Sequence, residues 1–192
     1  MKTDKFNYDL PEHLIAQYPP SKRTDSKLLV AIESIQHQVF KDIGNYINKG
    51  DLLILNKTSV IPARLYGEKA TGGKIEILLE RFLSDNQTLT QIRSSRSPKE
   101  GAELVFSFQG QRFLATVEGR QDNFFILNWS DDPKSLFEQY GQIPLPPYMN
   151  REAEKLDEER YETIYADPNQ KASVAAPTAG MHFDQELLNS LQ

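Results

Sequence analysis

Six short segments between residues 64 and 129 restrict the possible folds of this chain more than any other feature of its sequence. Each is rich in aliphatic, aromatic or β-branched residues, and turn-forming residues such as Thr71-Gly72-Gly73 and Gln109-Gly110 separate it from the next. Strands at such short and regular spacing favour a small antiparallel barrel. The predicted strands are residues 64–68, 74–81, 89–93, 103–108, 112–118 and 123–129.

The sequence on either side of this region has the pattern of an α/β domain. Residues 52–55 are a continuous apolar run, Leu-Leu-Ile-Leu, as expected for a parallel strand that is covered on both faces. Residues 174–176 predict a second short buried strand, which Pro177 ends because proline cannot donate a ladder hydrogen bond. A weaker third strand of the same kind is predicted at residues 28–32.

Capping residues predict where helices begin and end. Asp132 caps a helix whose first position is Pro133, and Gly141 ends that helix. Asp9 and Glu12 have the spacing of a capping box. The other expected elements are a short helix or irregular turn at residues 39–47, a charged helix at 151–165 and a helix at 185–191 capped by Asp184.

Together these elements predict the α/β fold class, with a discontinuous α/β domain that is interrupted by an inserted small antiparallel β-barrel. The α/β domain comprises residues 1–62 and 144–192, and the barrel domain comprises residues 63–143. Two or three parallel strands are few for a doubly wound sheet. The α/β domain is therefore expected to be incomplete and truncated at its C-terminal end.

The composition excludes several classes of protein. The chain of 192 residues has no cysteine, which rules out disulfides and thiolate metal sites and fits a reducing cytoplasm. Three scattered histidines disfavour a zinc site, so no metal is expected. No apolar run reaches the length of a membrane span, and no contact with a membrane is expected. The net charge of −5 argues against a nonspecific nucleic-acid coat but leaves room for a local basic patch.

Polar residues follow the predicted strand at 52–55, which is where open α/β sheets hold their sites. Asn56 and Thr58 come directly after it, and Arg64 follows six residues later. These residues have two interpretations of equal weight from the local sequence: they orient a ligand, or they close a turn.

A second polar site is predicted near the C-terminus, in the small-residue stretch 173–183. Its single imidazole is His182, and Gly180 permits a close approach of backbone to a ligand. Taken alone, the stretch is more simply a packed strand-to-helix connection, and His182 a packed histidine.

Two further segments carry candidate contacts. Residues 93–99 form the densest basic loop, whose arginines and hydroxyls can grip a sugar–phosphate backbone, although an exposed, solubilising loop is the simpler interpretation. The proline-rich residues 143–148 are stiff, and they act either as a rigid linker or as a support for Tyr148, whose ring can stack on a base.

Seven motifs of the chain resemble, in order, those of the S-adenosylmethionine:tRNA ribosyltransferase-isomerase family of queuosine biosynthesis. Each motif is weak alone, but the ordered set is specific and extends over essentially the whole chain. The motifs are Asp9-Leu10-Pro11, Leu14-Ile15-Ala16-Gln17, Gly50-Asp51-Leu52-Leu53, Val60-Ile61-Pro62-Ala63-Arg64-Leu65, Thr71-Gly72-Gly73-Lys74, Pro144-Leu145-Pro146-Pro147-Tyr148 and the run Ala175-Ala176-Pro177-Thr178-Ala179-Gly180 with His182-Phe183.

The resemblance implies an enzyme that transfers and isomerises the ribosyl group of S-adenosylmethionine onto 7-aminomethyl-7-deazaguanine at the tRNA wobble position. The product is epoxyqueuosine, and adenine and methionine leave. S-adenosylmethionine is then a substrate, tRNA is the partner, and no further cofactor is implied. We also expect a monomer. Family members continue well past residue 192, so the chain alone is expected to be inactive.

The resemblance also suggests roles for individual residues. His182 is the candidate general base or acid, and Arg64 the candidate anchor for a carboxylate or phosphate. One departure is Ser59, where the family commonly has arginine, so no role is transferred to that side chain. The candidate substrate-binding residues are Asn56, Thr58, Thr178, Gly180 and Tyr148, and the candidate tRNA-binding residues are Thr71, Lys74, Arg93 and Arg96.

A hypothesis of another class is a noncatalytic RNA-binding β-barrel module on an α/β platform. It accounts for the barrel and the basic loop, but it leaves the loops around Asn56 and His182 without a role. Release of adenine from S-adenosylmethionine in the presence of tRNA distinguishes the two hypotheses.

Overall fold

The computed structural model describes residues 2–173 and 176–192, and the chain divides into two compact units. Unit 1 comprises Met1–Leu55, Leu145–Glu152 and Ala179–Gln192, and unit 2 comprises Asn56–Pro144 and Ala153–Thr178. Each unit is therefore built from segments that are distant in the sequence.

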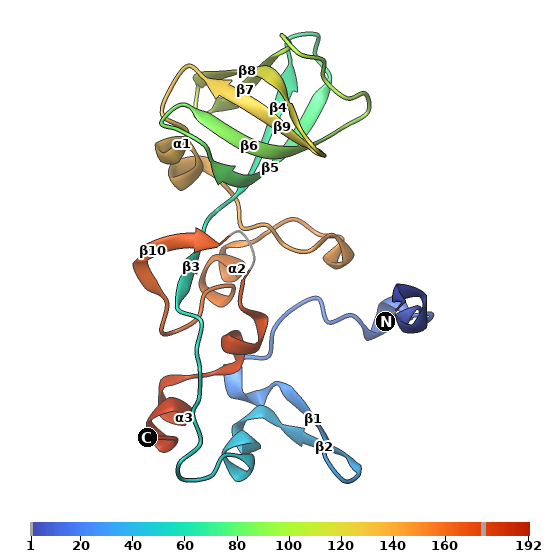
Figure 1. Cartoon of the computed structure of the whole chain (residues 1–192), viewed down its shortest axis with the longest axis vertical. Helices are drawn as coiled ribbons and strands as arrows, with labels where there is room; N and C mark the ends of the chain where they lie inside the picture. Colours follow the sequence, from blue (N-terminus) through green and yellow to red (C-terminus); the bar gives the residue numbers. More distant parts are fainter. Residues whose placement is uncertain (1, 174–175) are drawn as a thin grey trace. The chain divides into compact units, whose positions relative to one another are not determined.

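Unit 2 contains a closed barrel of six antiparallel strands (Figure 1), which confirms the prediction from the turn-separated segments. The neighbours around the barrel follow the order β4-β5-β6-β9-β8-β7. Its strands are β4 Arg64–Lys69, β5 Lys74–Phe82, β6 Gln87–Ser94, β7 Glu103–Phe108, β8 Gln111–Gln121 and β9 Phe124–Trp129.

The turn between β4 and β5 shows how the local sequence sets the barrel topology. Lys69 N–H donates to the carbonyl of Gly73 at 2.8 Å, and Gly72 adopts a φ of +85°, which side chains disfavour. The segment Thr71-Gly72-Gly73 is thus the hairpin turn that the sequence predicts.

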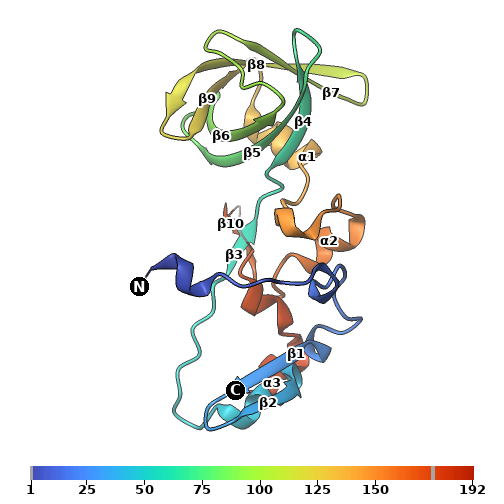
Figure 2. The ribbon, with the colours of Figure 1, turned by 90° about the vertical axis from the view of Figure 1, so that its right-hand side faces the viewer.

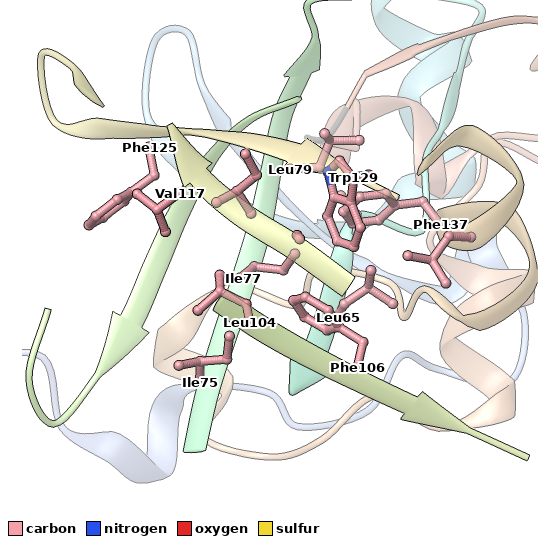
Figure 3. Packing of buried hydrophobic residues seen from close by; sticks show 14 of the residues in the cluster. Leu65, Ile75, Ile77, Leu79, Leu104, Phe106, Val117, Phe125, Trp129 and Phe137 are labelled. Atoms are coloured by element: carbon pink, nitrogen blue, oxygen red, sulfur yellow. The ribbon is translucent and has the colours of Figure 1, made fainter. Parts of the chain in front are cut away.

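The barrel is filled by side chains that alternate along the strands. On β5, Ile75, Ile77 and Leu79 are buried, while the intervening residues face outward. Figure 3 shows these side chains meeting those of the facing strands inside the barrel. The other labelled members of this core are Leu65, Leu104, Phe106, Val117, Phe125, Trp129 and Phe137.

Helix α1 (Pro133–Tyr140) packs against one end of the barrel (Figure 2). Asp132 caps it as predicted, because its carboxylate accepts hydrogen bonds from the backbone N–H groups of Lys134 and Ser135. The Phe137 ring packs edge-on against Trp129, with ring centroids 5.9 Å apart. The helix therefore adds an aromatic side chain to the barrel core.

The rest of unit 2 is a short parallel pair and a small helix. Strand β10 (Asp167–Ser173) pairs in parallel with β3 (Thr58–Val60), and helix α2 covers Lys155–Arg160. The fold class is therefore α/β with a barrel, as predicted, although the charged helix expected at 151–165 is only six residues long.

Unit 1 has little regular structure. A hairpin of β1 (Lys27–Ala31) and β2 (Ile35–Val39) is followed by the 3₁₀ segment η4 (Phe40–Tyr46), which confirms the turn predicted at 39–47. The remaining elements are the 3₁₀ turns η1 Thr3–Phe6, η2 Glu12–Leu14, η3 Arg23–Asp25, η5 Pro147–Met149 and η6 Thr178–His182, whose first residue belongs to unit 2, and the helix α3 Gln185–Ser190.

Two strand predictions for this unit are wrong. Residues 52–55 have no strand pairing, and the side chains of Leu52 and Ile54 are 84% and 82% exposed. A β-strand needs a neighbour for its N–H and C=O groups, and the described part of the chain supplies none here. The strand near residue 28 exists, but it pairs antiparallel with β2 instead of joining a parallel sheet.

Two further predictions differ from the structure. The helix expected after Asp9 is reduced to the 3₁₀ turn η2, without a side-chain cap at Pro11. The buried strand expected at 174–176 falls mostly outside the described residues, although β10 leads up to it from Asp167.

Candidate functional site

The loop after residue 55 places two of the predicted substrate-binding residues in contact with each other. The Asn56 side-chain oxygen accepts hydrogen bonds from the N–H of Thr58 at 3.0 Å and from its hydroxyl at 2.7 Å. This is an Asx turn, so the turn-closing interpretation is correct for the Asn56 oxygen and the Thr58 hydroxyl donor. A ligand role for the pair remains a prediction.

Directly after this turn, Ser59 contacts a residue that the sequence analysis missed. Its hydroxyl donates to Glu162 Oε2 at 2.6 Å, and the Val60 N–H lies 3.4 Å from the same carboxylate. Glu162 is 103 positions away and stands among other acidic residues, so no local signal identified it. Ser59 is buried, and the Glu162 carboxylate therefore bonds to an interior part of β3.

An ion pair lies at the start of the parallel pair β3–β10. Lys57 Nζ lies 3.6 Å from Asp167 Oδ2. The pKa of Asp167 is lowered from its ordinary value of 3.8, first because the Asn169 N–H donates to the carboxylate and further by the charge of Lys57. These contacts favour the ionised form of Asp167 at the start of β10.

Arg64, the predicted anchor for a carboxylate or phosphate, lies at the start of β4 with its charge already compensated. Its Nε is 3.0 Å from Glu76 Oε1, and the two side chains are 12% and 25% exposed. An incoming anion must share the guanidinium with Glu76. Because Arg64 lies on the outer face of β4, a ligand must approach from that face to contact the guanidinium.

The predicted proton-transfer residue, His182, ends the turn η6 in unit 1. Its Nδ1 lies 2.9 Å from Ser26 Oγ, and its ring centroid is 5.2 Å from that of Phe40. Gly180 is buried in the same turn. Ser26 and Phe40 are not identified by any sequence motif, because 156 and 142 positions separate them from the histidine.

Tyr148 lines a groove of about 420 Å³ in unit 1. Its side chain is 62% exposed, so one face of the ring is available for stacking. The groove also involves Ile15 and Gln17, from a motif that carried the family resemblance. The remaining lining residues are Glu12, Met149 and Asn150.

The four predicted tRNA-binding residues lie together at one end of the barrel, and all four are exposed. Thr71 is in the β4–β5 turn, and the register pairs Glu76 with Arg93 and Ile75 with Ser94, which brings Lys74 near the loop that contains Arg96. We call this end, residues 69–74 and 93–99, the basic end of the barrel.

The loop of the basic end is held in place by residues that the sequence analysis did not select. Lys69 Nζ and the Ser94 hydroxyl both donate to the Arg96 carbonyl, at 2.9 and 2.8 Å. The Arg120 guanidinium donates to the Ser97 hydroxyl at 2.5 Å and stacks on Phe125 at 4.1 Å. Three hydrogen bonds therefore connect this loop to itself and to β4 and β8.

A second groove, of about 400 Å³, lies where β4 and β7 separate. The two strands pair only at Glu68–Val105 and Lys69–Leu104, so Tyr66 has no partner on β7. The groove is lined by Tyr66, Gly67, Glu68, Lys74, Val105 and Ser107. It joins an aromatic side chain to the lysine of the basic end.

The predicted site residues belong to both units. Asn56, Thr58 and Arg64 are in unit 2 with the exposed Thr178, whereas Tyr148, Gly180 and His182 are in unit 1. A reaction centre shared by Arg64 and His182 remains a prediction. Within residues 2–173 and 176–192, no three His, Asp or Glu side chains are grouped to hold a metal ion, and no helix has the length and apolar character to span a bilayer.

The fold and the two polar loops are those of an α/β protein with an inserted barrel, and comparison with known proteins identifies its family. A family model described as "Queuosine biosynthesis protein" matches residues 3–192. The chain belongs to this family, as the motifs predict.

Relatives and a solved structure are named as S-adenosylmethionine:tRNA ribosyltransferases. The chain is 48% identical to an S-adenosylmethionine:tRNA ribosyltransferase-isomerase from Acinetobacter baylyi and 46% identical to one from Legionella pneumophila, in both cases over 100% of its own length and 56% of the relative's. A solved S-adenosylmethionine tRNA ribosyltransferase from Thermotoga maritima is 32% identical over 97% of this chain and 53% of that one, with a TM-score of 0.37. The chain thus spans about half the length of these proteins.

Proposed function

We propose that the chain is part of a tRNA-modifying enzyme that transfers and isomerises the ribosyl group of S-adenosylmethionine. The acceptor is 7-aminomethyl-7-deazaguanine at the wobble position, the product is epoxyqueuosine, and adenine and methionine leave. The observation that carries this proposal is the 46–48% identity, over the whole chain, to relatives of that name.

The chemistry needs three kinds of group, and the chain offers candidates for the base and for the anchor. The sulfonium acidifies the neighbouring ribose carbon, so a base must remove a proton there, and His182 is the candidate. A donor must assist the departure of adenine, and an anchor must hold the methionine carboxylate, which suits the guanidinium of Arg64. Asn56, Thr58, Thr178 and Gly180 orient the substrate around these groups.

The tRNA must present an unstacked wobble base to this chemistry. The groove beside Tyr148 has an exposed aromatic ring on which a base can stack. The basic end of the barrel offers Lys74, Arg93, Arg96 and the hydroxyl of Thr71 to the tRNA backbone, and two hydrogen bonds to the Arg96 carbonyl support the loop.

We further propose that the chain needs the part of its relatives that lies beyond the match. The test compares the chain alone with a fusion in which the C-terminal remainder of the Acinetobacter baylyi relative follows it. Both are incubated with S-adenosylmethionine and substrate tRNA, and free adenine is measured. The fusion is expected to release adenine, and the chain alone is not.

The role of His182 is tested in the same fusion. Replacing it by alanine should lower the rate of adenine release by about 10²–10⁴-fold, the usual contribution of general acid–base catalysis. The control is His37→Ala, because His37 is exposed on β2. A fusion that binds tRNA but never releases adenine would support the noncatalytic RNA-binding module instead.

A further inference from the structure

The His182 ring contacts residues of two other segments of unit 1. The Phe40 ring of η4 packs at 5.2 Å between centroids, and Ser26 Oγ lies 2.9 Å from Nδ1. The neutral imidazole carries one proton, on either nitrogen, and the nitrogen without it is the basic one. The contact with Ser26 shows which nitrogen of His182 carries the proton only if the direction of this hydrogen bond is known.

The other contact of Ser26 supplies that direction. A serine hydroxyl has a single hydrogen to donate and two lone pairs that accept. Ser26 Oγ lies 2.9 Å from the carbonyl oxygen of Arg23, the first residue of η3, and the Ser26 N–H is 3.4 Å from the same oxygen. A carbonyl cannot donate, so this short contact requires the serine hydrogen.

We infer that Ser26 fixes the tautomer of His182, with the proton on Nδ1 and the lone pair on Nε2. The hydrogen bonds then run in one direction, from Nδ1–H to the Ser26 hydroxyl and from that hydroxyl to the Arg23 carbonyl. Reversing the first bond would take the serine hydrogen away from the carbonyl. Ser26 is therefore a positioning residue that selects which nitrogen of the ring is basic.

The segments that carry Ser26 and His182 are joined at two other points, which fixes the geometry of this relay. Arg23 Nη1 donates to the Met181 carbonyl at 2.9 Å, directly before the histidine. The Thr24 hydroxyl donates to Asp184 Oδ2 at 3.0 Å, and Asp184 Oδ1 accepts the Leu187 N–H at the start of α3. Loss of the serine hydroxyl therefore leaves η3 attached to both sides of His182.

The catalytic meaning of this tautomer rests on the proposed function. If His182 removes a proton from the ribose, Nε2 is the atom that accepts it, and the Ser26 hydroxyl stabilises the resulting imidazolium through Nδ1–H. The tautomer itself does not depend on any activity, so it can be tested on the chain alone.

The test is ¹⁵N NMR of the 192-residue chain with labelled histidine, at a pH at which the imidazoles are neutral. His13 and His37 are exposed and serve as internal references for a ring whose tautomer is not fixed. The His182→Gln variant assigns the third set of signals. The expected result is a protonated-type shift for Nδ1 of His182 and an unprotonated-type shift for Nε2. A proton on Nε2 in the wild-type chain would overturn the inference.

Two variants test the role of Ser26. Ser26→Thr keeps a hydroxyl and should keep the tautomer, whereas Ser26→Ala should move His182 towards the mixture shown by His13 and His37. An unchanged His182 spectrum in Ser26→Ala would refute the role of the hydroxyl. In the fusion, Ser26→Ala should lower the rate of adenine release ~10-fold or more, since part of the rings then carry the proton on Nε2. If the tautomer is as expected but His182→Gln releases adenine normally, the tautomer stands and the catalytic role fails.

Discussion

At the scale of single residues, Thr88 and Thr90 on β6 form a natural comparison. Both side chains are fully buried in the barrel. The Thr88 hydroxyl accepts the indole N–H of Trp129 at 2.8 Å, whereas the Thr90 hydroxyl has no hydrogen-bond partner among the described residues. Two buried threonines on the same strand therefore differ in whether the hydroxyl oxygen makes a hydrogen bond.

We predict opposite results for the two threonine-to-valine substitutions, which preserve the shape of the side chain. Thr88→Val leaves the buried Trp129 N–H without an acceptor and should lower the free energy of unfolding by about 1–3 kcal/mol. Thr90→Val removes a buried hydroxyl without a partner and should be neutral or stabilising. Urea denaturation of the two variants measures both effects. Equal destabilisation by both would contradict the assignment of the Trp129 hydrogen bond.

The sequence predicted the role of single residues in the fold where that role is local. Asp132, Gly141 and the turn at Gly72 follow from their neighbours in the chain, and the structure confirms them. Glu162 and Ser26 were missed because their partners are more than 100 positions away. Isolated Ser and Glu residues have too many ordinary roles for sequence spacing to identify such pairs.

At the scale of elements, helix α1 depends on its aspartate cap. Asp132 accepts hydrogen bonds from the Ser135 hydroxyl and from two backbone N–H groups, and these contacts lower its pKa from the ordinary value of 3.8. Asp132→Ala should lower the free energy of unfolding by about 1 kcal/mol at neutral pH. Asp131→Ala is the control, because Asp131 accepts a hydrogen bond from Ser130 and does not cap the helix.

The effect of the Asp132 cap should depend on pH in a defined direction. Because the folded pKa is lowered, the unfolded chain takes up the proton first as the pH falls. The stabilisation is therefore complete above the ordinary pKa of 3.8 and is lost as the pH falls through the lower, folded pKa. Unfolding curves of the wild type and of Asp132→Ala should converge at acidic pH. A gap that widens on acidification would show that the carboxylate is not the stabilising species.

A further prediction at the scale of elements concerns tRNA binding by the basic end of the barrel. Arg93→Ala and Arg96→Ala should each weaken tRNA binding by a similar factor for any tRNA. Each should also reduce the slope of log affinity against log salt concentration by about one unit, the loss of one phosphate contact. Fluorescence anisotropy at several salt concentrations measures both quantities. Arg112→Ala is the matched control, since Arg112 is exposed at the opposite end of β7 and β8. Equal weakening by all three variants would place the RNA elsewhere.

Strand prediction succeeded in the barrel and failed at residues 52–55 for one physical reason. Four of the six strand pairings in the barrel join sequence neighbours, and every barrel strand has at least one such partner, so each local signal has a partner close by in the chain. A parallel strand needs a partner from a distant segment. The apolar run at 52–55 carries the signal of a covered strand, but the described residues do not provide its cover.

At the scale of the whole molecule, this exposed run is expected to be covered in the full-length relatives. The chain spans 56% of their length, so other segments are available there to pair with residues 52–55. Ile54→Lys should change the stability of the chain alone by less than ~0.5 kcal/mol, as for other exposed positions, but it should destabilise the fusion with the Acinetobacter baylyi remainder. Ile32→Lys is the control, because Ile32 is 73% exposed after β1. Equal effects in the chain and the fusion would show that the run stays exposed.

The junction between Arg64 and Gln142 has a consequence for how such a molecule arises. The N–H of each residue donates to the carbonyl of the other, at 3.1 and 2.8 Å, so the polypeptide enters and leaves the barrel at the same point. A module with adjoining ends can be spliced into a host loop, or removed from it, with little distortion of either. The basic end is carried by this module, and the histidine is not. The proposed nucleic-acid contacts and the proposed proton-transfer residue are thus free to have separate ancestries and to be exchanged independently by recombination.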